Sequence, residues 1–497
     1  MHIGSLFRNY EAALGVLAKD LEAGELSRLE MGGVCKQFEL VVKLGWNLWK
    51  EYLVYKDIAP KFKNPRLTIA ECRANGVFEE AGIDGAVFAQ MFEDRIHLSD
   101  LYNFDEFAHI ATSLKRYYLK ELITTQTFFT EFLNGNDYGR LIKKMVEEHN
   151  MDSIKMIHRL SGAFGAPGFE DDVIEAAKEF VPDSYTCERD SLLNLYITSK
   201  QRKEDAKTVL VEAHSDELGL MVQYVRPNGT LSVVALGSWA HCALPSQRMR
   251  IKNLDGKIVS GIVAAKPPHL TSGTGAVPEI SELSVDVGAT SALEVEREYR
   301  IGVGCPMVPD AVFEYRQEND LIIGKAFDCR LGCAAVLDVL NNAGDTKINL
   351  VGALCSQEEV GARGARVVAE RVRPDVVICF EGSPADDTFA EAPVVALKKG
   401  PMIRHMDSGA ITNPRLMRLT LDVARKAGIQ CQEAVRASSF TNAAAYQTLG
   451  IPAVVIACPV RYIHSHNAIA AASDYDKAVK LAVEVIQSLD DKTISSL

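Results

Sequence analysis

Four hydrophobic runs beyond residue 200 are each followed by side chains that can bind a metal ion. They span residues 209–211, 348–354, 376–380 and 453–457, and they lead to His214, to Glu358 and Glu359, to Glu381, and to His464. Short apolar runs that alternate with helical patterns are typical of buried strands in a parallel sheet. Ligands bind beyond the carboxyl ends of such strands. We therefore expect these imidazoles and carboxylates to meet at one edge of a sheet.

Histidine and carboxylate side chains that meet at one point are typical of a site where two divalent metals activate water. His214 and Asp216 flank one small residue, so both side chains point the same way on an extended segment. One of them can bind a metal while the other orients the imidazole. Asp328 precedes an expected helix at 331–340, where it could be an N-cap, a bridge between two cations, or both.

Glu358 and Glu359 are adjacent carboxylates that directly follow a buried strand. One can bind a metal while its neighbour takes a proton from water. Taken singly, these residues could be ordinary loop acids, and His464 could be a hydrogen-bonded buried histidine. Taken together, they would require five independent coincidences at one sheet edge, so the sequence predicts a metal-dependent hydrolase.

Composition excludes several other classes of protein. The chain has 497 residues, a formal net charge of -12, 47% hydrophobic residues and no dense Lys/Arg stripe, which argues against nucleic-acid or anionic-membrane binding. It shows neither a signal-peptide pattern nor an apolar run that could span a bilayer. Its eleven cysteines form no CxxC pair, as expected for reduced thiols. We expect a soluble, cytoplasmic protein.

The pattern of the chain changes three times. Residues 1–133 are helical throughout, and residues 134–150 contain a polar linker and a short helix. Strands and helices alternate over 151–217 and 316–497, whereas 218–315 contains short β-prone stretches at 220–225, 231–236, 248–251 and 257–263. We predict an α/β fold with a mixed sheet flanked by helices, an inserted β-barrel-like domain and an N-terminal all-α bundle.

The stretches AHSDELGLMV, LPSQRMRI, GKAFDCRLGC, SQEEVGARGA and CPVRYIHS resemble, in order, the M42 family of metalloaminopeptidases, which includes glutamyl and tetrahedral aminopeptidases. The resemblance runs from about Met151 to the C-terminus. It implies a zinc-exopeptidase-like fold with two divalent ions per subunit, Zn or else Co or Mn. Asp328 would bridge the ions. His214 and Glu381 would complete one site. Glu359 and His464 would complete the other.

The same resemblance implies that Glu358 is the general base and that Asp216 is the partner of His214. It implies peptide substrates that are trimmed from the N-terminus, dimerisation through the inserted β domain, and a large homo-oligomer. Two departures leave a two-metal carboxypeptidase or amidohydrolase/deacylase as an alternative. Glu381 stands where the family usually has Asp, and Asn442 replaces an Asp expected near the substrate end of the site.

The first 133 residues resemble a different family, the nucleotidyltransferase substrate-binding proteins, which are HEPN-like four-helix bundles. The matching segments are residues 38–50, 65–73 and 94–102. An Arg-Asn turn of that family is Arg95-Ile96 here, and Asp100 stands near the expected His. The resemblance implies a protein partner for the bundle. The corresponding hypothesis is a binding protein that recruits a nucleotidyltransferase-like partner through this bundle, and the other interpretation is a helical appendage that packs or docks.

Overall fold

The protein is described by a computed structural model, which covers residues 3–22, 27–56, 58, 65–100, 104–135, 151–270 and 278–497. The chain forms two compact units, Met1–Asn150 and Met151–Leu497. Apart from the end of one helix, the predicted linker and short helix at 134–150 lie outside the described residues. No helix in the described part of the chain combines the length and the apolar character needed to cross a lipid bilayer.

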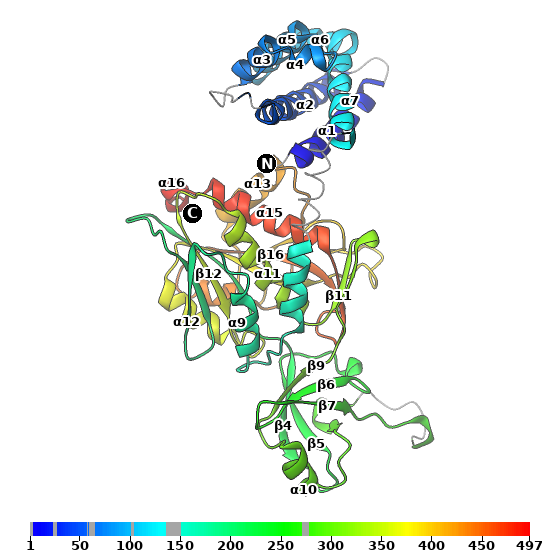
Figure 1. Ribbon diagram of the computed structural model, residues 1–497, viewed down its shortest axis with the longest axis vertical. Helices are drawn as coiled ribbons and strands as arrows, with labels where there is room; N and C mark the ends of the chain where they lie inside the picture. The colour runs from blue at the N-terminus through cyan, green and yellow to red at the C-terminus, as the bar shows by residue number, and fades with distance from the viewer. Residues whose placement is uncertain are drawn as a thin grey trace. The chain divides into compact units, whose positions relative to one another are not determined.

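The first unit is a set of helices (Figure 1), and these helices pack around a core rich in aromatic side chains. Its helices are α1 (Ile3–Glu22), α2 (Arg28–Tyr55), α3 (Pro65–Ala74), α4 (Val77–Glu80), α5 (Gly85–Asp100), α6 (Phe104–Ser113) and α7 (Leu119–Gly135), with a π-helical turn at Leu114–Tyr118. Trp49 is fully buried, and its ring centroid lies 5.3 Å from that of Phe78 and 4.8 Å from that of Phe129. The predicted all-α bundle is confirmed.

An eleven-stranded mixed sheet forms the centre of the second unit. Its main path runs in the order β1 (Tyr185–Arg189), β2 (Leu195–Ser199), β12 (Asn349–Cys355), β3 (Thr208–His214), β13 (Val376–Pro384), β16 (Ala453–Arg461), β17 (Ala468–Ala471), β11 (Leu321–Gly324) and β10 (Glu314–Arg316), while β14 (Met402–Met406) pairs with β16 and with β15 (Gln432–Val435). The neighbours β12, β3, β13 and β16 are parallel. They contain the four hydrophobic runs, so the predicted parallel strands are confirmed.

Helices cover both faces of this sheet because its central strands are apolar on both faces. On β3, Val209 and Val211 belong to one hydrophobic core and Leu210 to another. The first core includes α9 (Asp171–Lys178), α11 (Phe327–Asn342), α13 (Pro414–Lys426) and α15 (Ala472–Ser488). The second core includes α12 (Arg363–Val372) and α14 (Ala443–Gln447). Such double coverage is what parallel strands require.

A closed barrel is inserted between β3 and β10 (Figure 1). Its strands are, in order around the barrel, β4 (Gly219–Val225), β5 (Leu231–Leu236), β8 (Ser284–Asp286), β7 (Ile258–Val263), β6 (Arg248–Lys252) and β9 (Pro306–Pro309). Its interior has its own core, with Leu220, Val233 and Met249 fully buried. The predicted barrel-like insertion is confirmed as part of the fold, and its strands lie between Gly219 and Pro309. Because the barrel leaves the sheet at the carboxyl end of β3, it borders the predicted site.

Gly400 gives a direct test of the close backbone packing between the segments that precede β14 and β15. It has a φ of +86°, and an added Cβ would overlap the carbonyl oxygen of Gln430. We expect Gly400→Ala to lower the free energy of unfolding of the second unit by more than about 2 kcal/mol, since backbone strain and overlap add. Gly428→Ala is the control, because its φ is +64° but nothing lies within 4 Å of an added Cβ. Equal calorimetric melting temperatures for the two variants would show that the overlap with Gln430 has no cost.

Candidate metal centre

His214, Asp328 and Glu381 meet at the carboxyl ends of the parallel strands. His214 is the last residue of β3, Glu381 lies in β13, and Asp328 lies in the first turn of α11. The Nε2 atom of His214 is 3.1 Å from Asp328 Oδ1 and 3.3 Å from Glu381 Oε1. These three residues and Cys329 each offer a ligand atom, and the four atoms lie within 4.8 Å of one another. The predicted convergence of these three residues is therefore present in the structure.

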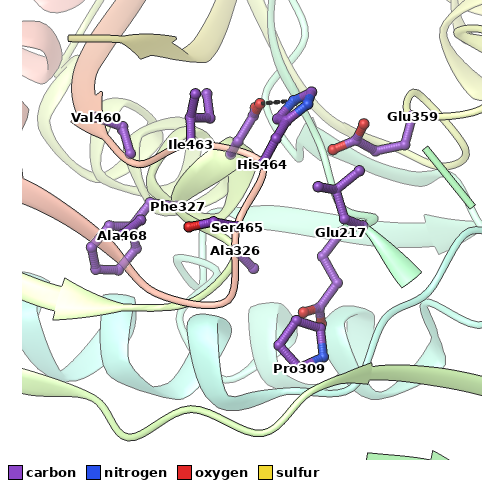
Figure 2. Close-up of a pocket in the computed structure, with 12 residues that line it drawn as sticks. Glu217, Pro309, Ala326, Phe327, Glu359, Val460, Ile463, His464, Ser465 and Ala468 are labelled. Atoms are coloured by element: carbon purple, nitrogen blue, oxygen red, sulfur yellow. Dashed lines mark hydrogen bonds and ion pairs between the residues drawn. The ribbon is translucent and has the colours of Figure 1, made fainter. Parts of the chain in front are cut away.

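A second group shares Asp328. Its Oδ2 atom lies 3.3 Å from Nε2 of His464, and Glu359 brings a carboxylate oxygen within 4.8 Å of both. Figure 2 shows Glu359 and His464 together in the upper part of the view, while Glu217 and Pro309 lie below them. The two oxygens of Asp328 thus face two different histidines.

Both histidines are held so that Nε2 points toward Asp328. Nδ1 of His214 donates to the Asp216 backbone carbonyl at 3.2 Å and lies 3.3 Å from Asp216 Oδ1, and Nδ1 of His464 donates to the Ser238 carbonyl at 2.6 Å. A histidine whose Nδ1–H is donated in this way has a free Nε2 lone pair for a metal. Asp216 was predicted in this position. Ser238 was not, because a backbone carbonyl leaves no signal in the sequence.

The backbone at the start of α11 directs the Asp328 side chain into the site. Asp328 has φ -90° and ψ 106°, outside the helical region. Its carboxylate faces the two histidines, as the interpretation of Asp328 as a bridge between two cations requires. Gly382 of β13 makes room for it, since a Cβ there would lie 3.0 Å from Asp328 Cβ.

The site concentrates negative charge in a buried place. Hydrogen bonds from His214 and His464 outweigh burial and hold the pKa of Asp328 well below its usual value. Burial and the nearby Asp328 charge raise the pKa of Glu359 and of Glu381 well above the usual range. Burial, together with Asp216 and Asp328, raises the pKa of Glu358 to about 7. Carboxylates resist ionising together in this way unless cations compensate them.

The residues present fit divalent cations. Two imidazoles and three carboxylates supply the nitrogen and oxygen ligands that Zn and similar ions accept. Among the described residues, Glu359 Oε1 is buried without a hydrogen-bond partner, as expected for an oxygen that a cation would complete. Cys329 was not predicted. Its thiol donates to the Phe380 carbonyl at 3.3 Å, beside the ligand group.

A buried ion cluster fastens the two segments that carry His214 and Asp328. Both carboxylate oxygens of Glu217 accept bonds from Lys325, and Oε1 also lies 3.1 Å from Arg330 Nη2. All three side chains are at most 2% exposed. Arg330 also donates to the Ser215 carbonyl at 2.9 Å, so the cluster links the end of β3 to the start of α11. Sequence reasoning missed this cluster, because its members lie in two distant segments.

Asn442 forms a buried hydrogen bond with a residue of β3. Its Nδ2 atom donates to Glu212 Oε2 at 2.9 Å, and the side chain is buried. Glu212 precedes His214 by two residues on β3, so Asn442 packs beneath the metal group. That Asn442 removes a charge near the substrate end of the site stays a prediction.

Comparisons with known proteins agree with this geometry. Residues 194–481 match the family model described as M42 glutamyl aminopeptidase, and residues 5–131 match the one described as nucleotidyltransferase substrate binding protein like. A glutamyl aminopeptidase of Lactococcus lactis subsp. cremoris is 30% identical over 351 residues, which are 70% of this chain and 98% of that protein. A lysyl aminopeptidase of Pyrococcus furiosus is 32% identical over 300 residues, 58% of this chain and 83% of that protein.

Solved structures give the same result. A TET aminopeptidase from a marine sediment archaeon of the Thaumarchaeota has a TM-score of 0.66 and 31% identity, covering 70% of this chain and 99% of that chain. The two resemblances predicted from the sequence are confirmed by the family models. With its cluster of histidines and carboxylates at the strand ends, this chain belongs to the M42 family of metal-dependent aminopeptidases.

Proposed function

We propose that the chain is a dinuclear-metal aminopeptidase that removes residues from the N-termini of peptides. The observation that carries the proposal is the position of Asp328, whose two oxygens face His214 and His464 separately. Asp328 would bridge two divalent ions. His214 and Glu381 would hold one, and Glu359 and His464 the other. The ions, when bound, would supply Lewis acidity toward water and toward the scissile carbonyl.

Glu358 is the proposed general base. Its carboxylate lies at the edge of the cluster, with Oε2 at 3.9 Å from His214 Nε2. Its pKa of about 7, raised chiefly by burial, suits a group that must accept and release a proton near neutral pH. Glu358 would take a proton from the attacking water and deliver it to the leaving amine.

Aminopeptidase activity is favoured over the carboxypeptidase or deacylase alternative by the activities named for the relatives. The motives for the alternative are Glu381 and Asn442, and Asn442 is hydrogen-bonded to Glu212. One relative is a glutamyl and the other a lysyl aminopeptidase, so we assign no preferred terminal residue. Zn, Co and Mn all accept this ligand set.

We also propose that the barrel contributes to a homo-oligomer. The chain resembles a TET aminopeptidase over its second unit. Several apolar side chains of the barrel are exposed, among them Leu254, Ile262 and Val303, at 60%, 54% and 71%. Exposed apolar residues gathered on one small domain suit contact with a second copy.

Removal of divalent ions tests the ligand set. Because the clustered carboxylates repel one another, the metal-free protein should melt at a lower temperature than protein saturated with Zn, Co or Mn. An ion at about 100 times its Kd adds about 2.7 kcal/mol of stability. Asp328→Asn should lose most of this gain, whereas Asp345→Asn, at a 97% exposed carboxylate, should keep it. If calorimetry showed that added ions stabilise both variants equally, the result would argue against Asp328 as a shared metal ligand.

Substitution of the proposed base separates chemistry from metal binding. Glu358→Gln should lower kcat by about a hundredfold or more while the ion content measured by elemental analysis stays unchanged, since it removes the proton acceptor alone. Glu359→Gln should instead weaken the binding of one ion. Full turnover in Glu358→Gln would rule out Glu358 as the base.

Peptides blocked at either end test the direction of cleavage. An aminopeptidase should release the first residue from a C-terminally amidated peptide and leave an N-terminally acetylated peptide intact. Mass spectrometry of the products, with and without added ions, makes the comparison. The reverse pattern would support the carboxypeptidase or deacylase alternative.

A further inference from the structure

The loop between β12 and α12 carries both Glu358 and Glu359. Its backbone is left-handed at Gln357, Gly361 and Ala362, with φ of +56°, +115° and +50°. Left-handed backbone is unfavourable for residues other than glycine, and it persists only where the surroundings over-determine it. Contacts outside the loop must therefore hold it in place.

Those contacts come from buried side chains. The backbone N–H groups of residues 356–359 donate, in chain order, to Asn194 Oδ1 (3.0 Å), Glu170 Oε1 (3.1 Å), Asp216 Oδ1 (2.9 Å) and Asp216 Oδ2 (3.0 Å). All three acceptors have an exposed fraction of 0%. Four successive donors are thus satisfied by three residues from three separate segments, and none of the four bonds is a strand or helix bond.

Glu170 is the most informative of the three. Its Oε1 accepts the N–H groups of Gly168 and Gln357, so it ties the segment before α9 to the loop. Among the described residues, its Oε2 is buried without a hydrogen-bond partner. Burying a carboxyl in this way is costly, so an apolar residue would serve packing better.

We propose that Glu170 and Asn194 are positioning residues for the peptidase reaction, fixing the loop so that Glu358 reaches the water and Glu359 reaches its ion. This proposal rests on the function proposed above. It adds two residues to Asp216, whose carboxylate holds the next two N–H groups and also faces His214. Displacements of about 1 Å at catalytic groups cost about a hundredfold in rate. Removing the side chains that fix this loop should therefore lower kcat measurably.

Two substitutions of similar volume isolate the acceptor at position 170. Glu170→Met keeps the volume and removes the acceptor, whereas Glu170→Gln keeps an oxygen for the two N–H groups. In the full chain, we expect Glu170→Met to lower kcat and the affinity for one divalent ion by about 10- to 100-fold, with KM changing far less. Glu170→Gln should stay within a few-fold of the wild type in both measurements.

Asn253→Ala is the matched control. Asn253 is a buried acceptor for the N–H groups of Asp255 and Lys257, and it holds a turn of the barrel. Its substitution should lower the melting temperature while leaving kcat and the ion affinity unchanged. If Glu170→Met behaves like this control, Glu170 only stabilises the fold and the proposal fails.

The ion measurement keeps the two proposals distinguishable. Affinities for Zn or Co, measured by competition with a chromogenic chelator, compare Glu170→Met with Glu170→Gln without any substrate. If no peptide is cleaved by the wild type, the proposed function fails, but a weaker ion site in the Met variant alone would still support positioning of Glu359. If Glu170→Met does not fold, Asn194→Leu removes the neighbouring acceptor, and unchanged ion affinity and kcat there would overturn the proposal.

Discussion

A carboxylate placed between two imidazoles is the constraint on which the second unit depends. Asp328 lies within 3.3 Å of the Nε2 atoms of His214 and His464. His214 is the last residue of β3 and His464 follows β16, and these two strands flank β13. The first turn of α11 departs from helical geometry at Asp328, and Gly382 of β13 leaves room for the Asp328 side chain. The parallel order of the strands is therefore what makes the shared contact geometrically available.

Only some of the buried carboxylates around Asp328 are neutralised by nearby basic side chains. Glu217 is matched by Lys325 and Arg330 within the buried ion cluster. Close by, the proposed ligand carboxylates and Glu358 outnumber the two histidines, and burial raises the pKa of Glu358 to about 7. A fold selected for stability alone would avoid such an excess, so the imbalance indicates that this part of the molecule is kept for binding cations and for chemistry.

The sequence was sufficient for the strands and for the residues at their ends, because continuous apolar runs and the side chains that follow them are local patterns. It was insufficient wherever a contact uses the backbone or joins distant segments. Ser238 acts through its carbonyl, and Glu170 and Asn194 act on backbone N–H groups of a loop far along the chain. Glu212, the partner of Asn442, was not predicted for the same reason, because it is identified only by the packing of α14 on the sheet.

The bond between Ser238 and His464 has a consequence for how the molecule is built. Ser238 follows β5 of the barrel, whereas His464 follows β16 of the large sheet. Two residues beyond Ser238, the N–H group of Ala240 donates to the His464 carbonyl at 3.1 Å. The inserted module therefore sets the rotation of an imidazole that it does not itself contain. A chain reduced to its α/β portion would retain every candidate ligand, but it would lose the contact that orients His464.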